Sequence, residues 1–133
     1  MDAIRERIYK GRDGWQAETR FALGKTPEGK DRILDVNTWK RSRGGVQTLA
    51  TAAIADEGGF ITMDVFGDYR KTVIESPAVR CTEKTVRTQH AEALAKIGDV
   101  HADAVTFYQM KDGAKAIAAR RDAELAEQDK AYR

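Results

Sequence analysis

The segment WKRSRGGVQTLATAAIADEGGF, residues 39–60, decides the fold that we predict for this chain. Its middle, Val46 to Ala55, is a run of small and β-branched residues between two glycine-containing stretches, RSRGG and DEGG. Glycine, aspartate and serine supply the backbone angles that tight reversals require. The segment is therefore predicted to be a strand that is joined to its neighbours by hairpins, with a basic turn at its first end.

Two further strands are predicted upstream. From Trp15 to Leu23 apolar and polar side chains alternate, which is the period of a half-buried strand. The stretch GKTPEG that follows is a turn by its composition. A second strand is predicted from Arg32 to Lys40, where Leu34, Val36 and Thr38 share one face.

Downstream, strands are predicted from Phe60 to Phe66 and from Tyr69 to Glu75. Gly67-Asp68 between them fits a two-residue type II′ turn, which has glycine first. The opposite pairs in that register are Phe66 with Tyr69, Asp64 with Lys71, Thr62 with Val73 and Phe60 with Glu75. Aromatic, opposite-charge and β-branched pairs of this kind stabilise adjacent strands, so these two strands are predicted to form a hairpin.

The period of the sequence changes after Ser76-Pro77. Thr82 is a typical N-cap, and the following residues repeat three and four positions apart, as on one face of a helix. That face carries Val86, His90, Ala93, Leu94, Ile97, His101, Ala104, Val105 and Tyr108. A long helix is predicted over residues 82–111, with a kink or an early stop near Gly98. Asp112-Gly113 is predicted to break it before a polar helix or tail at 114–132.

The first ten residues are ambiguous, because Ile4 and Ile8 suit either a helical turn or a short strand; a short helix is favoured. Together these elements predict an α+β fold. A five-stranded antiparallel meander over residues 15–75 is packed by the helix at 82–111. Residues 1–111 are expected to form one domain with a short N-terminal arm at 1–14, and residues 112–133 a polar C-terminal helix or tail.

Composition and charge narrow the classes of function. With 133 residues, of which 41% are hydrophobic, the chain can bury a core without disulfides or metal. Its 23 basic and 21 acidic residues nearly balance, so binding to nucleic acid requires local charge. The one cysteine, Cys81, and the absence of an apolar leader or span favour the cytoplasm, with no membrane partner.

Motifs for chemistry are weak. Gly24-Lys25-Thr26 resembles the end of a phosphate-binding loop, but the glycine required five positions earlier is Thr19, and Pro27 follows where a helix should begin. His90 and His101 are eleven residues apart, too far along one helix to hold one ion. Cys81 has no histidine in local reach. We therefore expect no enzyme, no metal and no cofactor.

The most suggestive feature is the basic hairpin tip. Trp39, Lys40, Arg41 and Arg43 stand together there, and the N-terminal arm adds Arg5, Arg7, Lys10 and Arg12. Clustered cations beside an aromatic ring suit single-stranded nucleic acid, but a basic tip can equally be solvated or contact a protein. The favoured function is a small binding or assembly protein that acts through protein–protein contacts or self-association. The alternative is nucleic-acid binding.

The helical region supports the assembly reading. Its stripe continues through Ala114, Ala118, Leu125 and Tyr132, with Lys111, Arg121 and Gln128 intruding. Such a stripe can pack on the sheet or pair with a second helix, and packing on the sheet is favoured. A nearly all-polar C-terminal helix in so small a protein is better explained by a partner.

Overall fold

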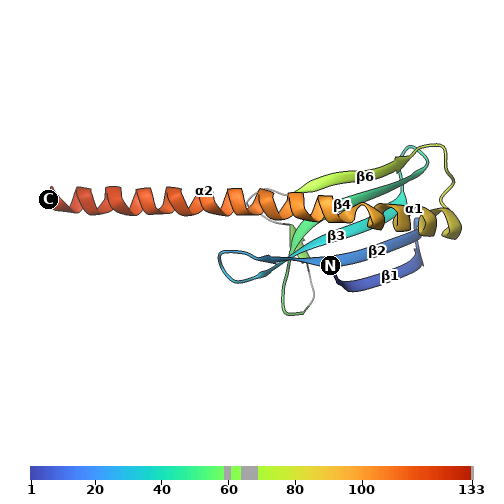
Figure 1. Ribbon diagram of the computed structural model, residues 1–133, viewed down its shortest axis with the longest axis horizontal. Helices are drawn as coiled ribbons and strands as arrows, with labels where there is room; N and C mark the ends of the chain where they lie inside the picture. Colours follow the sequence, from blue (N-terminus) through green and yellow to red (C-terminus); the bar gives the residue numbers. More distant parts are fainter. Residues whose placement is uncertain (59–60, 64–68, 133) are drawn as a thin grey trace.

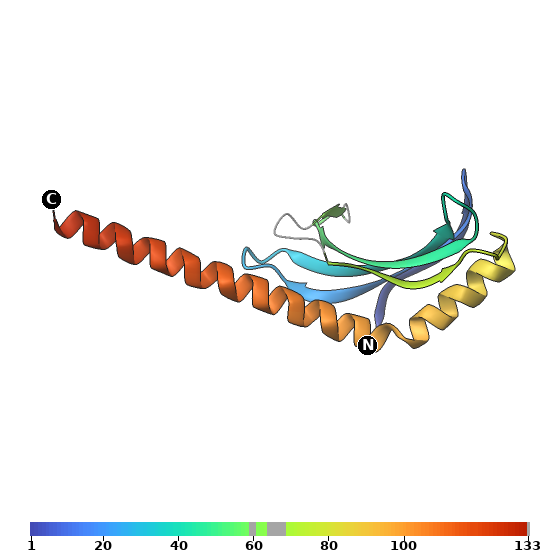
Figure 2. The ribbon, with the colours of Figure 1, turned by 90° about the horizontal axis from the view of Figure 1, so that it is seen from above.

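The computed structural model describes residues 1–58, 61–63 and 69–132 of the chain. It consists of one curled antiparallel sheet with two helices on a single face (Figure 1). Seen from above, the sheet curves away from the helices, so its helix-free face is concave (Figure 2). The predicted α+β fold with an antiparallel sheet is confirmed.

The centre of the sheet is β2 (Gly14–Lys25), β3 (Asp31–Lys40) and β4 (Val46–Ala55), each antiparallel to the next. Their bounds lie within two residues of the predicted strands. Leu34 and Val36, on the predicted apolar face of β3, are completely buried. The turn predicted at GKTPEG is also present, since Thr26 N donates to Lys30 O at 2.8 Å.

The basic RSRGG stretch forms the predicted turn between β3 and β4. Arg41 N donates to Gly45 O at 3.0 Å, and both Gly44 and Gly45 have φ angles near +90°, at 92° and 91°. A Cβ atom on Gly45 would lie 2.3 Å from the backbone oxygen of Ser76. Glycine is therefore required at position 45, where the start of β4 passes close to the end of the last strand.

The prediction of a short N-terminal helix is wrong, because β1 (Ala3–Gly11) is an edge strand that pairs with β2. The spacing of Ile4 and Ile8 suggested one helical face, but the two side chains have different surroundings. Ile8 packs against Ala17 in the sheet, whereas Ile4 is 59% exposed. Pairing with β2 makes this segment a strand, and the sequence of residues 1–10 alone does not reveal that pairing. Most of the segment that was predicted to be an N-terminal arm, residues 1–14, therefore belongs to the sheet.

The predicted hairpin between the last two strands is also wrong. β5 (Ile61–Met63) and β6 (Arg70–Ser76) both pair with β4, one after the other along the same edge. Thr62 therefore lies opposite Ile54 and not opposite Val73. The long β4 accepts both segments, and this pairing outweighs the local turn signal. The predicted turn at Gly67-Asp68 and the pairs of Phe60, Asp64 and Phe66 lie outside the described residues.

The helical region begins where it was predicted, and the predicted kink near Gly98 is confirmed, but the predicted break at Asp112-Gly113 is wrong. α1 (Glu83–Ala95) starts with a reciprocal cap, in which Thr85 N donates to Thr82 Oγ1 and Thr82 N donates to Thr85 Oγ1. The chain turns at Lys96, close to Gly98, and α2 (Ile97–Ala131) then runs through Asp112-Gly113 without interruption. A glycine inside a helix costs only about 1 kcal/mol. Asp112 is held by an ion pair to Arg32 at 2.9 Å.

The main core lies between the sheet and the first part of α2. Its buried members are Phe21, Leu34, Val36, Ala50, Ala52, Tyr69, Ile97, Val100, Ala104 and Tyr108. The predicted packing of the helical stripe on the sheet is thus confirmed as far as Tyr108. None of the helices formed by the described residues combines the length and apolar composition that a membrane span requires.

The contact between α1 and the sheet is largely polar. Its apolar cluster contains only Ala17, Val46 and Val86 as buried members. Beside it, the His90 ring lies between two threonine hydroxyls, with Nε2 2.8 Å from Thr19 Oγ1 and Nδ1 2.7 Å from Thr38 Oγ1. These hydrogen bonds fix the position of α1 on the sheet, because buried polar groups require their partners.

Candidate binding surfaces

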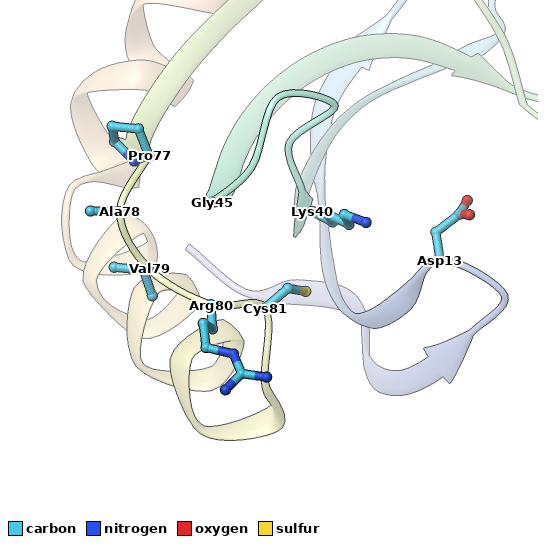
Figure 3. A pocket seen from close by; sticks show the side chains of 8 residues that line it. All are labelled: Asp13, Lys40, Gly45, Pro77, Ala78, Val79, Arg80 and Cys81. Atoms are coloured by element: carbon cyan, nitrogen blue, oxygen red, sulfur yellow. The ribbon is translucent and has the colours of Figure 1, made fainter.

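Cations from three segments gather at one end of the sheet. The β1–β2 turn, the β3–β4 turn and the 77–81 segment surround a hollow of about 480 Å³ (Figure 3). Asp13, Lys40 and Arg80 are among the residues that line it. We call this region the basic end and define it by Lys10, Arg12, Lys40, Arg41, Arg43 and Arg80. The predicted hairpin tip is therefore one part of a larger charged surface.

The four tip residues differ in their freedom to bind a partner. Arg41 is engaged, since its Nε lies 2.9 Å from Glu75 Oε1 and its Nη1 donates to Gly44 O at 3.0 Å. Trp39 is half-buried, so only part of its ring is available for stacking. Lys40 and Arg43 are exposed. The tip thus offers two exposed cations beside a partly covered aromatic ring.

The four predicted N-terminal cations divide between two places. Lys10 and Arg12 are exposed next to the β1–β2 turn and belong to the basic end. Arg5 and Arg7 lie on the concave face instead, where both contact Glu18. The structure therefore brings six of the eight predicted residues to one end and places the other two elsewhere.

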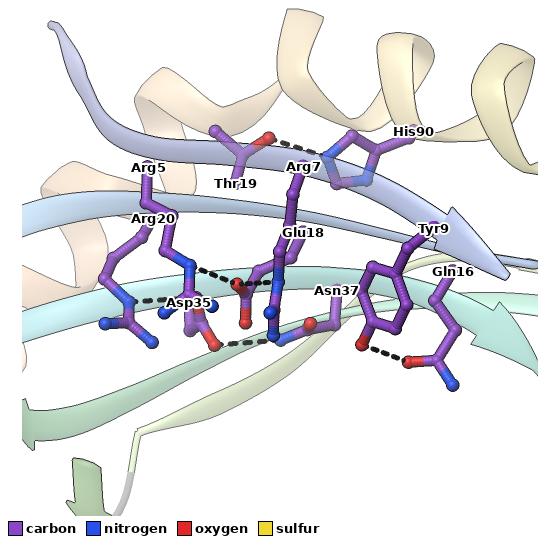
Figure 4. Close-up of polar contacts among 10 residues, drawn as sticks. All are labelled: Arg5, Arg7, Tyr9, Gln16, Glu18, Thr19, Arg20, Asp35, Asn37 and His90. Carbon is purple, nitrogen blue, oxygen red and sulfur yellow. Dashed lines mark hydrogen bonds and ion pairs between the residues drawn. The ribbon is translucent and has the colours of Figure 1, made fainter. Parts of the chain in front are cut away.

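A second charged group occupies the concave face (Figure 4). Glu18 Oε1 lies 3.1 Å from Arg5 Nε and 2.8 Å from Arg7 Nε. Arg20 Nε lies 3.4 Å from Asp35 Oδ1. The side chains of Glu18, Arg20 and Asp35 are at most 8% exposed, although no helix covers this face. We call these five residues the concave cluster.

The electrostatics of the concave cluster follow from this burial. Burial raises the pKa of Asp35, and the neighbouring Glu18 carboxyl raises it further. The Asn37 amide, 3.2 Å from Asp35 Oδ2, and the Arg20 guanidinium act in the opposite direction. Each carboxylate has an arginine partner. The cluster therefore gives both carboxylates an opposite charge, with one arginine in excess, and ties β1, β2 and β3 together.

Sequence reasoning missed the concave cluster. Glu18 and Arg20 occupy the polar side of an alternating strand, a pattern that normally faces solvent. The signal lies in the register, which places Arg7 opposite Glu18 and Arg20 opposite Asp35. Once β1 is recognised as a strand, opposite charges coincide across three strands. Without that strand the pattern is not visible.

The histidines and the cysteine have structural surroundings. Burial lowers the pKa of His90, whose ring is held by the two threonines. The His101 ring lies 2.7 Å from the backbone oxygen of Ala22. Cys81 is half-buried and donates a long hydrogen bond, 3.5 Å, to Trp15 O. Within residues 1–58, 61–63 and 69–132, no group of three or more His, Cys, Asp or Glu side chains is placed to hold a metal ion.

The third candidate surface is the end of α2. Beyond Asp112 the helix leaves the sheet and extends alone (Figures 1 and 2), and residues 113–131 are all exposed. We call these residues the projecting segment. Lys115 near its start forms an ion pair with Glu28 at 3.3 Å. Large apolar side chains are exposed in and beside this segment: Met110, Ile117, Leu125 and Tyr132.

No family model, no curated protein and no solved structure matches this chain.

Proposed function

We propose that this chain is a non-catalytic assembly protein that binds another protein chain through the projecting segment of α2. The observation that carries the proposal is the helix itself, which continues past the sheet with every residue from 113 to 131 exposed. The sheet and the first part of α2 then serve as a base that holds this helix in place.

The energetics of the projecting segment support a partner. Most of the stability of helices in proteins comes from packing of one face, and residues 113–131 are all exposed. Exposed ion pairs such as Glu127–Lys130, at 3.7 Å, each contribute about 0–1 kcal/mol. The alanine-rich sequence favours helix, but only a packed face would hold all of these residues in one conformation.

The side chains on the segment support the same proposal. Ile117 is 59% exposed and Tyr132 is 93% exposed, and both fall on one stripe of the helix. Exposed apolar residues in a row mark interaction sites more often than isolated ones do. The intervening alanines are small enough to let another helix approach closely.

Deletion of residues 114–133 tests the proposal. The shortened protein should lose association in sedimentation velocity and light scattering, because the deletion removes the contact surface. Its near-UV circular dichroism and tryptophan fluorescence should match those of the full chain, because Trp15 and Trp39 lie in the sheet. A full-length chain that stays monomeric and captures no partner that the shortened chain lacks would contradict the proposal.

A second candidate function is nucleic-acid binding at the basic end, which the gathering of cations from three segments favours. Affinity for single-stranded DNA or RNA should fall steeply with salt, and substitution of Lys40 and Arg43 by alanine should flatten that dependence. Absence of binding at about 50 mM salt would remove this candidate.

We also propose the cytoplasm as the compartment. The chain has one cysteine, and its thiol is free, which fits a reducing environment. Fractionation of cells that produce the chain tests this assignment.

A further inference from the structure

We propose that the partner of the projecting segment is a second copy of this chain, and that the two α2 helices pair antiparallel about a two-fold axis at Arg121. This inference rests on the proposed assembly function and specifies its partner. The evidence is the spacing of the stripe, the order of charges along it and the open surroundings of its first residue.

The exposed face of α2 that is used here has an eleven-residue spacing and consists of Met110, Ala114, Ile117, Arg121, Leu125, Gln128 and Tyr132. Met110, Arg121 and Tyr132 are eleven residues apart, and the same interval relates Ala114 to Leu125 and Ile117 to Gln128. Eleven residues in three turns give about 3.67 residues per turn, close to the period of a straight helix. A face with this spacing stays on one side of α2 along its length. It can therefore meet a second straight helix over the whole segment.

An antiparallel pair centred on Arg121 places each residue opposite the one equally far beyond Arg121 in the second copy. Met110 then lies opposite Tyr132 of the second copy, and Ile117 opposite Leu125 of the second copy. In this register large apolar side chains meet each other. Met110 is 71% exposed, so the second helix can reach this position beside the sheet.

The charges along the helix complement each other in this arrangement. Within residues 110–132, the first half carries Lys111, Lys115 and Arg120 against one acidic residue, Asp112, and the second half carries Asp122, Glu124, Glu127 and Asp129 against one basic residue, Lys130. Antiparallel pairing lays the basic half of one helix on the acidic half of the other. At the flanks of the seam, Arg120 comes next to Glu124 of the second copy, and Lys111 next to Asp129 of the second copy. The two-fold axis repeats both pairs.

A parallel, in-register pair would reverse this effect. It would lay the basic half of one helix on the basic half of the other, and the acidic half on the acidic half. Like charges would then face each other along the seam, so the sequence opposes the parallel arrangement and favours the antiparallel one.

The axis itself carries an unfavourable contact. Arg121 lies within the stripe and meets Arg121 of the second copy, so two like charges approach each other. Replacement of this residue by leucine, as in Arg121→Leu, should therefore tighten the dimer. This response distinguishes pairing centred on residue 121 from binding of an unrelated partner. With an unrelated partner, Arg121 would not meet a second Arg121, and its removal would relieve no repulsion.

Cysteine cross-linking tests the geometry. In a Cys81→Ala background, the variants Arg121→Cys, Ala114→Cys and Gln128→Cys are oxidised singly and in mixtures. Two helices with axes about 8 Å apart bring facing Cα atoms within disulfide range. We expect Arg121→Cys alone to form a linked dimer, and Ala114→Cys to link only with Gln128→Cys. Comparable self-linking at all three positions would indicate parallel pairing and overturn the inference.

Sedimentation equilibrium tests the same contact without cross-linking. Ile117→Lys should raise the dimer dissociation constant about tenfold or more, since a charge replaces a central apolar residue. Ala119→Lys is the matched control: it adds the same charge two residues away on the opposite side of the helix, and it should leave the constant within about twofold. Equal effects of the two substitutions would overturn the proposed face.

The outcomes separate this inference from the proposed function. A full-length chain that remains monomeric at high concentration, with no linked Arg121→Cys dimer, refutes self-pairing. If such a chain still binds a different protein, and loses it on deletion of residues 114–133, the assembly function stands without the dimer. If dimers form but survive that deletion, both proposals fail.

Discussion

Replacement of His90 by leucine should destabilise the protein by about 2–3 kcal/mol near pH 7.5. The ring is 5% exposed and makes two hydrogen bonds, at 2.8 Å to Thr19 and 2.7 Å to Thr38. An unsatisfied buried polar group costs about 1–3 kcal/mol. Thr38 keeps Thr48, at 2.7 Å, as a partner, so Thr19 bears most of the loss. Leucine has a similar volume, which limits any added cavity cost.

The same substitution should change how stability depends on pH. Burial lowers the pKa of His90 below its usual value of 6.5, so the native state holds the ring neutral while the unfolded chain takes up a proton near that pH. The contribution of His90 is fully present above pH 6.5 and declines as the pH falls. The decline is at most about 1.4 kcal/mol per pH unit, down to the native pKa. The leucine variant lacks this decline.

Urea unfolding between pH 5.5 and 8, followed by tryptophan fluorescence, measures both effects. Trp15 and Trp39 report on the sheet, so the signal follows the domain and not the projecting segment. All other titrating groups are common to both proteins, and the difference between the two curves isolates His90. His101→Leu is a suitable control that should retain the decline. If His90→Leu unfolds with the wild-type pH dependence, or loses less than about 0.5 kcal/mol, our account of this contact is wrong.

Three further changes have clear expected results. Gly45→Ala should lower the free energy of unfolding, measured with urea, by about 2 kcal/mol more than Gly44→Ala does. Both glycines have positive φ angles, but only Gly45 lacks room for a Cβ atom. Glu18→Gln should lower the pKa of Asp35 toward its ordinary value, measured by NMR titration, since the Glu18 carboxyl raises it; an unchanged pKa would refute the contact. Thr82→Ala should cost about 1 kcal/mol in thermal unfolding, because it removes the cap of α1.

The parts of the fold that were predictable are those with local signals. The central strands alternate in sequence, and the basic turn between β3 and β4 carries two glycines. Thr82 marks the start of α1 because capping depends only on neighbouring residues. In each of these cases, the residues that determine the structure lie within one short window.

The parts that failed depend on distant partners. β1 is a strand because β2 accepts it, and β5 and β6 follow each other because β4 has room for both on one edge. The helix continues through Gly113 although the sequence there suggests a break, and the neighbouring Asp112 is anchored to Arg32 on the sheet. Pairing of this kind is set by tertiary contacts, which override local propensity.

The candidate surfaces show the same division. The basic tip was recognisable from four neighbouring residues, but the ion pair of Arg41 with Glu75 needed the position of β6. The burial of Glu18 needed both the register of β1 and the curl of the sheet. The charged residues in the sequence were therefore enough to locate this surface. Only the fold showed which of these residues already form ion pairs within the protein.

The charged edge strand has a consequence for how copies of this chain can meet. β1 ends the order of strands, so one of its sides has no neighbouring strand among the described residues. Arg5, Glu6, Arg7 and Lys10 crowd this border with ionic groups. Such groups discourage a foreign strand from adding to a sheet. Growth into continuous β-ribbons is thereby disfavoured, which agrees with the contact through the projecting segment that we propose.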